Sequence, residues 1–534
     1  MPVMFGTPVL VFLLTSLTVV ALAKSQAQPG FDLIIRDGHV LDGTGNPWLR
    51  QDIGIQAGRI TAVGRLESAT APRVIEARGR IVAPGFIDVH SHAADALTRE
   101  ELRQAQPLIA QGITTIVANP DGGGTIDLAR QRTELEAGGI GPNVALLIGH
   151  GRIRGSVIGS ANRDPSASEL DRMRDLVRRA MEEGAFGLSS GLFYTPGSYA
   201  KTEEVIELAK IAASYGGLYT SHIRDEGNYN IGVVAAVQEV IRIADEAKTI
   251  GIVSHAKALG PDNWGLAHAI TQRIEQARRR GVQVFADQYP YEASSTSLRA
   301  ALLPDGVRVP TREHLSMPEG LAPGDREVFV RAEQVATENL RRRGGASAIL
   351  IAHYRPDRTL EGRSLQQIAD ARRQTPVRTA LELIAVQSPS IVSFNMSEED
   401  IAELMRQPYT MTSSDGGLVA LGEGRPHPRN YGAFARKLSR YVRDREALTL
   451  EHAVRSMTSL PAAVFGMKDR GIIREGAAAD IVIFDPEKIA ERSTYTDPHQ
   501  LAEGMDYVMV NGELVVDDAK FTAALPGKVL RRVP

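Results

Sequence analysis

The chain of 534 residues contains no cysteine. It therefore forms no disulfide, offers no thiolate to a metal ion and has no cysteine to which a lipid could be attached. It also lacks a long basic run, and its formal net charge is only -3 at pH 7. Because acidic and basic residues are mixed throughout, nucleic acid is not expected to be the main partner.

The N-terminal residues resemble an export signal. An apolar run from Val9 to Ala23 ends in Ala21-Leu22-Ala23, although no Lys or Arg precedes it. The run is shorter than the ~20 apolar residues that a membrane span requires. We therefore expect residues 1–23 to be a signal peptide and the mature protein to be exported, periplasmic or secreted, without a stable membrane span. An uncleaved anchor is the alternative.

The order of predicted elements indicates an α/β protein. Short strands are predicted over 31–83 and again over 468–534, and the simplest arrangement pairs both chain ends in one small β domain. Over 84–467, apolar strands alternate with amphipathic helices, and eight such units predict a (β/α)8 TIM-like barrel. The segment 294–345 is longer than a crossover needs, which predicts an insertion or lid near the barrel mouth.

Ionisable residues follow most of the predicted barrel strands, at the end where barrel enzymes carry their reactive groups. These residues are His90, His92, Asp121, His150, His222, His255 and Asp415. The first two are one residue apart at a strand end, so both imidazoles can face one ion. Histidine and carboxylate ligands predict Zn²⁺ or a similar divalent ion, one or two in number, with an open position for water. A single histidine here could instead be an ordinary core or surface residue.

Further roles follow from the chemistry of a metal-activated water. Asp415 would accept a proton from that water and pass it to a departing amine, which leaves poorly unless it is protonated. Three cations could receive a substrate carboxylate, namely Arg224, Lys257 and Arg429. Arg224 could instead form an ion pair with a neighbouring acid. His150, which lies between two glycines, is expected to be structural.

Several motifs resemble the amidohydrolase superfamily. They are Pro84-Gly85-Phe86-Ile87-Asp88-Val89-His90-Ser91-His92, Ser221-His222, Ser254-His255-Ala256-Lys257 and Ser413-Ser414-Asp415-Gly416. Other motifs resemble its D-aminoacylase (N-acyl-D-amino-acid deacylase) branch: Gly187-Leu188-Ser189-Ser190-Gly191-Leu192-Phe193-Tyr194, His222-Ile223-Arg224-Asp225-Glu226 and His427-Pro428-Arg429. The similarity covers most of the chain after the leader.

The resemblance implies a zinc-dependent amide hydrolase, with a barrel and a flanking β-sandwich made from both chain ends. It implies that the metal site is surrounded by His90, His92, His222, His255 and Asp415, and that the substrate is contacted by Lys257, Tyr289 and Arg429. The chain departs from the branch after strand two. There the branch has a cysteine ligand and this chain has Asp121, which could coordinate through its carboxylate or could be a turn residue. No lysine follows strand four, so a carboxylated-lysine bridge has no candidate.

The expected activity is metal-dependent hydrolysis of N-acyl-D-amino acids to a carboxylic acid and a free D-amino acid. A hydantoinase-like or dihydroorotase-like hydrolase of cyclic amides or dipeptides is the alternative enzyme, and an inactive binding protein is the alternative of another class. The expected partner is a small-molecule N-acyl amino acid, and the expected state is a monomer or small homo-oligomer.

Overall fold

The computed structural model describes residues 1–3, 30–303, 306–316 and 321–532. Most of the predicted signal peptide, residues 4–23, therefore lies outside the described residues. Within the described part of the chain, no helix is both long and apolar enough to cross a membrane.

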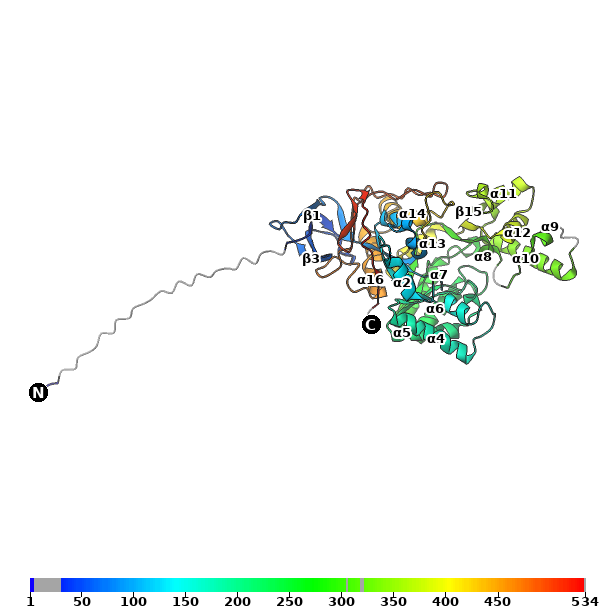
Figure 1. The fold of residues 1–534 in the computed structure, drawn as a ribbon, viewed down its shortest axis with the longest axis horizontal. Helices are drawn as coiled ribbons and strands as arrows, with labels where there is room; N and C mark the ends of the chain where they lie inside the picture. The colour runs from blue at the N-terminus through cyan, green and yellow to red at the C-terminus, as the bar shows by residue number, and fades with distance from the viewer. Residues whose placement is uncertain (4–29, 304–305, 317–320, 533–534) are drawn as a thin grey trace.

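Both chain ends contribute strands to one sheet, at the end of the molecule where blue and red ribbons meet (Figure 1). Its order is β21-β20-β19-β18-β5-β1-β2-β3, with β4 beside β1. The antiparallel pairing of β5 with β18 joins the N-terminal strands to the C-terminal strands. The strands are β1 Leu33–Val40, β2 Leu49–Gln56, β3 Arg59–Gly64, β4 Arg73–Glu76, β5 Ile81–Pro84, β18 Ile481–Phe484, β19 Met505–Val510, β20 Glu513–Asp517 and β21 Lys520–Phe521.

Two tight turns fix the register of hairpins in this sheet. Ala57 and Gly58 connect β2 to β3, and Asn511 and Gly512 connect β19 to β20. All four residues have positive φ, between 49° and 86°. Positive φ at both central residues is the backbone of a type I′ turn, whose twist matches that of the flanking strands. The short Ala-Gly and Asn-Gly pairs thus specify the hairpins locally.

The central part of the chain forms parallel strands in two runs, β22-β8-β7-β6 and β17-β13-β12-β11-β10-β9. Backbone bonds connect the two runs at both sides: Phe186 N donates to Leu146 O at 2.9 Å, and Asp415 N donates to His90 O at 2.9 Å. The strands are β6 Phe86–Ser91, β7 Ile113–Ala118, β8 Asn143–Leu146, β9 Ile148–Gly149, β10 Gly187–Gly191, β11 Leu218–His222, β12 Gly251–Val253, β13 Val284–Gln288, β17 Thr410–Thr412 and β22 Val529–Leu530.

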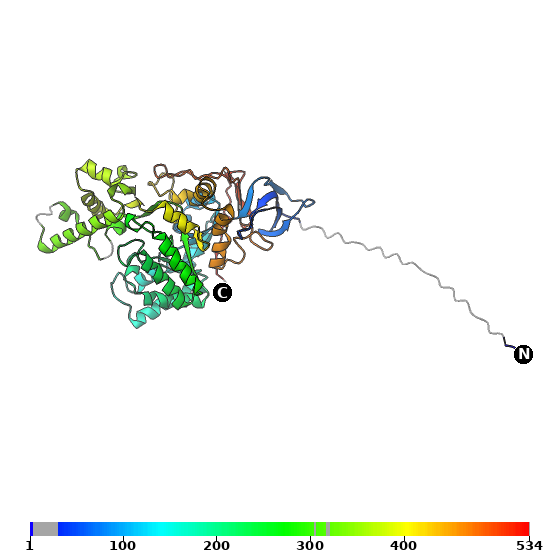
Figure 2. The same cartoon turned by 180° about the vertical axis from the view of Figure 1, so that it is seen from behind.

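Amphipathic helices follow these strands and cover them (Figure 2). In α4, Ser166 and Glu169 form a capping box that fixes where the helix begins. Its apolar face, with Met173 and Val177, is buried. The helices are α1 Gln106–Ile109, α2 Leu128–Glu136, α3 His150–Val157, α4 Ala167–Glu182, α5 Thr202–Ser214, α6 Val233–Ala247, α7 Ala267–Arg279, α13 Glu398–Met405, α14 Arg429–Arg436, α15 Leu450–Met457 and α16 Ser459–Phe465.

A separate lobe lies between β13 and β17, at the end of the molecule opposite the terminal sheet (Figures 1 and 2). It contains an antiparallel sheet of order β14-β16-β15 and its own apolar core, which includes Leu298, Ile351 and Leu381. Its elements extend past residue 345, where the sequence placed the end of an insertion. They are β14 Ala293–Ser297, α8 Leu298–Leu302, α9 Arg312–Ser316, α10 Pro323–Arg342, β15 Ile349–His353, α11 Leu365–Arg372, α12 Pro376–Val386 and β16 Ser390–Phe394.

Candidate metal centre and substrate cavity

The C-terminal ends of the parallel strands open into a cavity of about 550 Å³ that the lobe also lines. His90 lies in β6, and His92 directly follows that strand. Asp121 follows β7, His222 ends β11, His255 follows β12 and Asp415 follows β17. The structure therefore brings together all six residues that the sequence placed around a metal or its water.

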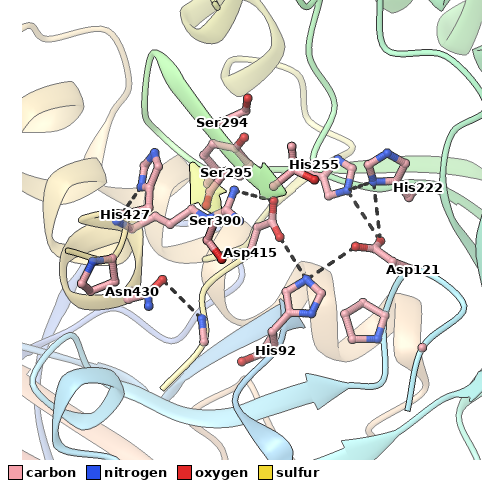
Figure 3. A pocket seen from close by; sticks show the side chains of 18 of the residues that line it. His92, Asp121, His222, His255, Ser294, Ser295, Ser390, Asp415, His427 and Asn430 are labelled. Carbon is pink, nitrogen blue, oxygen red and sulfur yellow. Dashed lines mark hydrogen bonds and ion pairs between the residues drawn. The ribbon is translucent and has the colours of Figure 1, made fainter. Parts of the chain in front are cut away.

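Two groups of donor atoms meet around Asp121 (Figure 3). One group contains His90, His92, Asp121 and Asp415, and the other contains Asp121, His222 and His255; within each group the donor atoms lie within 4.8 Å of one another. Asp121 Oδ1 is 3.3 Å from His90 Nε2 and 3.6 Å from His255 Nε2. Asp415 Oδ1 is 3.2 Å from His92 Nε2.

These separations fit a divalent ion. Ligand atoms about 2.0–2.2 Å from a tetrahedral zinc are roughly 3.3–3.6 Å apart. His90 Nε2 and Asp121 Oδ1 are buried and have no hydrogen-bond partner among the described residues. Buried polar atoms of this kind are normally satisfied, so a shared cation accounts for both. Because Asp121 belongs to both groups, the arrangement accommodates one ion or two.

The backbone around the centre is held in a conformation that L residues rarely adopt. Asp121, His255 and Asp415 have φ of 57°, 34° and 49°. Such residues concentrate at functional sites, where the surroundings must enforce the conformation. Two buried carboxylates hold the backbone at Asp415 and His255. Asp88 Oδ1 accepts a hydrogen bond from Ser414 N at 2.8 Å, and Asp287 Oδ1 accepts one from His255 N at 2.9 Å.

The charge states of His222 and Asp415 suit metal binding and proton transfer, respectively. Burial lowers the pKa of His222 to about 4, so its imidazole is neutral and able to coordinate. Burial opposes ionisation of Asp415, yet the charge of Arg429, whose Nη1 is 2.7 Å from Asp415 Oδ2, holds the pKa of Asp415 well below its usual range. Asp415 is therefore a carboxylate that can accept a proton.

Lys257, Tyr289 and Arg429 lie on one side of the cavity. Lys257 Nζ is 5.6 Å and the Arg429 guanidinium carbon 4.8 Å from the centre of the Tyr289 ring. The Tyr289 hydroxyl is buried and has no partner among the described residues. Arg429 Nη1 donates to Asp415 Oδ2 at 2.7 Å. Two cations and an unpaired hydroxyl thus converge next to the centre.

Glu226 is a partly buried cavity residue, for which the sequence suggested only a possible ion pair with Arg224. Its Oε1 accepts from Lys257 Nζ and lies 3.0 Å from His255 Nδ1. A carboxylate on the outer nitrogen of a ligating histidine fixes the ring orientation. Its position four residues after His222 could have indicated a place near the site. Its partners, Lys257 and His255, follow a different strand, so the sequence did not reveal them.

Arg224 is not brought to the cavity. Its guanidinium is paired with Glu239 of α6, with Nη2 2.8 Å from Oε1, and also donates to the backbone oxygens of Ser198 and Ala200. An arginine held this way joins neighbouring helices and loops and has no access to a substrate in the cavity. His150 is also away from the metal groups, since its Nε2 is bonded to Glu204 Oε1 at 2.9 Å.

Comparisons with known proteins extend over nearly the whole chain. The sequence profile of the Amidohydrolase family matches residues 73–516. N-acyl-D-glutamate deacylase of Alcaligenes xylosoxydans xylosoxydans is 36% identical over 527 residues, which are 95% of this chain and 97% of that protein. D-aminoacylase of the same organism is 34% identical over 534 residues, with 96% and 99% covered.

A solved structure has the same fold. It is the N-acyl-D-glutamate deacylase of Bordetella bronchiseptica, complexed with zinc and a phosphonate inhibitor that mimics the tetrahedral intermediate of its reaction. It matches this chain with a TM-score of 0.79 and 35% identity, covering 94% of this chain and 100% of that one.

Proposed function

This chain belongs to the amidohydrolase family, and on that basis we propose that it hydrolyses the amide bond of N-acyl-D-amino acids, releasing a carboxylic acid and a free D-amino acid. The observation that carries the proposal is that Lys257, Tyr289 and Arg429, which together we call the carboxylate-binding corner, lie beside the group of histidine and aspartate donors. An N-acyl amino acid has an amide to be cleaved and a carboxylate to be held, so it matches both features.

The donors for a zinc ion are His90, His92, Asp121, His222 and His255. A divalent ion held there would supply an activated water and polarise the scissile carbonyl. Asp121 takes the place of the cysteine that the sequence comparison with the D-aminoacylase branch led us to expect. Its carboxylate provides two oxygen donors in place of one sulfur, which suits a site shared by two groups of ligands.

Asp415 acts as the proton carrier. Its Oδ1 faces the histidine donors and its Oδ2 is held by Arg429, so the carboxylate is oriented at the place where the attacking water would lie. It accepts the proton of that water and delivers it to the amide nitrogen as the C–N bond breaks, because an unprotonated amine is a poor leaving group.

Lys257, Tyr289 and Arg429 bind the α-carboxylate of the substrate. The centre of the Tyr289 ring lies 5.6 Å from Lys257 Nζ and 4.8 Å from the Arg429 guanidinium carbon, and the unpaired Tyr289 hydroxyl can donate to a carboxylate oxygen. Both cations are paired with cavity carboxylates, Lys257 with Glu226 and Arg429 with Asp415. These pairs hold the cationic groups in place before the substrate arrives.

We also propose how the domains are arranged and where the protein is located. Apart from β22, the strands of the two parallel runs form one closed eight-unit barrel over 84–467, supported by the backbone bonds at both of their junctions. The terminal sheet is the centre of a β-sandwich domain from 31–83 and 468–534, within which β22 pairs with β8 of the parallel strands instead. The lobe serves as the lid. The apolar run before Ala23 supports export to the periplasm or the medium.

The test is a substrate comparison with purified protein. N-acetyl amino acids of both hands are compared with hydantoins and cyclic imides, and release of the free amine is followed. We expect N-acetyl-D-amino acids to be the fastest substrates. An exclusive preference for cyclic substrates would assign the chain to hydrolysis of cyclic amides, and no turnover of any of them would assign it to binding alone.

A further inference from the structure

The cavity is lined by a third cation, Arg343, which is the C-cap residue directly after helix α10 of the lobe. Only 2% of its surface is exposed. Burying a guanidinium is costly unless its charge is balanced and its donors are bonded. The carboxylates and hydrogen-bond acceptors near Arg343 therefore show whether the protein itself balances the charge of this guanidinium.

The structure provides no such anion from the described residues. None of their carboxylates lies within 4.0 Å of the Arg343 guanidinium, and its Nε has no hydrogen-bond partner. The two preceding arginines differ in both respects. Arg341 pairs with Asp262 at 2.9 Å, Arg342 pairs with Glu338 at 3.3 Å, and both are more exposed than Arg343.

A purely structural role does not explain the burial. A cation at a helix C-terminus is favourable through the helix dipole, but that benefit is available to an exposed side chain. Arg343 does lie near one neutral acceptor. When the Asn395 amide is oriented with its oxygen toward the guanidinium, that oxygen is 3.1 Å from Nη1. The Arg343 guanidinium carbon also lies 5.8 Å from the centre of the Tyr229 ring, whose π face attracts a cation. An amide oxygen and an aromatic ring still supply no negative charge and leave most of the five donors without an acceptor.

Arg343 lines the same cavity as Lys257, Tyr289 and Arg429. The same Asn395 oxygen lies 3.0 Å from Ser294 Oγ, so Arg343 and Ser294 reach one atom. Ser294 and Ser295 line the same cavity as Asp415 (Figure 3). The loop that follows Lys257 also contacts the end of α10.

Gly260 makes this contact possible. It has a φ of 93°, and a Cβ atom at this position would be 2.2 Å from the backbone oxygen of Arg342. Any other residue would therefore push the end of α10 away from the loop. The glycine keeps Arg343 close to the segment that carries Lys257.

We propose that Arg343 binds the side-chain carboxylate of the substrate, so that the preferred substrates are N-acyl derivatives of acidic D-amino acids, D-glutamate or D-aspartate. The proposal rests on the proposed function, which supplies the α-carboxylate and the amide. The planar guanidinium can bind a carboxylate through two parallel hydrogen bonds, and Ser294 adds a hydroxyl beside it.

The experiment measures kcat/KM for N-acetyl-D-Glu, N-acetyl-D-Asp, N-acetyl-D-Gln and N-acetyl-D-Leu. D-Gln has the shape of D-Glu without its charge, so it isolates the contribution of the carboxylate. For the wild-type protein we expect D-Glu or D-Asp to exceed D-Gln by roughly 30-fold or more, as for a buried charge pair that loses one partner. For Arg343→Gln we expect a loss of similar size with the acidic substrate and little change with D-Gln.

The matched control is Arg341→Gln, the same substitution on the exposed side of the same helix end, which should leave the acidic preference unchanged. A wild-type preference for D-Gln or D-Leu overturns the proposal whether or not Arg343→Gln folds, and so does an equal loss on all substrates in that variant. If no N-acetyl-D-amino acid is hydrolysed, the proposed function itself fails, whereas hydrolysis of the neutral substrates alone refutes only the role of Arg343.

Discussion

Lys437 provides a prediction about stability that follows from its burial. It is 1% exposed, and its Nζ donates to Thr412 Oγ1 and Ser456 Oγ, each at 2.8 Å. Burial lowers the pKa of this amine to about 7. Thr412 is the last residue of β17, three positions before Asp415, so Lys437 supports the strand that carries the proposed proton carrier.

The shift has a definite sign. In the unfolded chain the amine keeps its proton up to a pH of about 10.4. Between that pH and about 7 the unfolded chain holds a proton that the folded protein has released. The free energy of unfolding therefore rises with pH across this window, by up to ~1.4 kcal/mol per pH unit. From pH 7.5 to pH 9.5 the contribution of Lys437 amounts to roughly 2–3 kcal/mol.

Urea unfolding of the wild-type protein and of Lys437→Met, at a series of pH values, measures this contribution. Methionine has a similar length and no proton to release, and the lost hydrogen bonds give a difference that does not depend on pH. Other titrating groups cancel when the two proteins are compared. We expect the stability of the wild type relative to the variant to increase between pH 7.5 and 9.5. A difference that stays constant across that range would refute the reasoning.

Two further predictions concern the site. Asp415→Asn should lower kcat by ~10²–10⁴-fold, which is the usual contribution of a positioned acid-base group. KM should not rise, because Arg429 remains and is freed from its ion pair with Asp415. An unchanged steady-state kcat would exclude Asp415 as the proton carrier. Tyr289→Phe should raise KM by roughly 10–100-fold while largely preserving kcat, because a hydrogen bond to a charged group is lost. An unaltered KM would remove that hydroxyl from carboxylate binding.

The positions that could be predicted from the sequence are those fixed by strand order. His222 and His255 end or follow neighbouring strands, and parallel strands deliver their last residues to one face, so spacing along the chain was sufficient. The same logic placed Asp121 and Asp415. The assignment of a barrel-type α/β fold rested on the same alternation of strands and helices.

Side-chain partners across elements could not be predicted in this way. The sequence left the role of Arg224 open between a substrate and a neighbouring acid, and its actual partner is Glu239, one helix further along the chain. Glu226 bonds a lysine that follows the next strand. The position of Arg343 in the cavity depends on how the lobe packs against the loop after Lys257, and no local sequence pattern predicts that packing.

The most direct test of the central claim is metal analysis of the purified protein coupled to hydrolysis of an N-acetyl-D-amino acid. We expect one or two zinc ions or similar divalent ions per chain, loss of hydrolysis when a chelator removes them, and recovery when zinc is returned. His222→Ala should reduce the bound metal and the activity together. Full activity in protein that contains no metal would contradict the claim that these histidine and aspartate residues act through a bound ion.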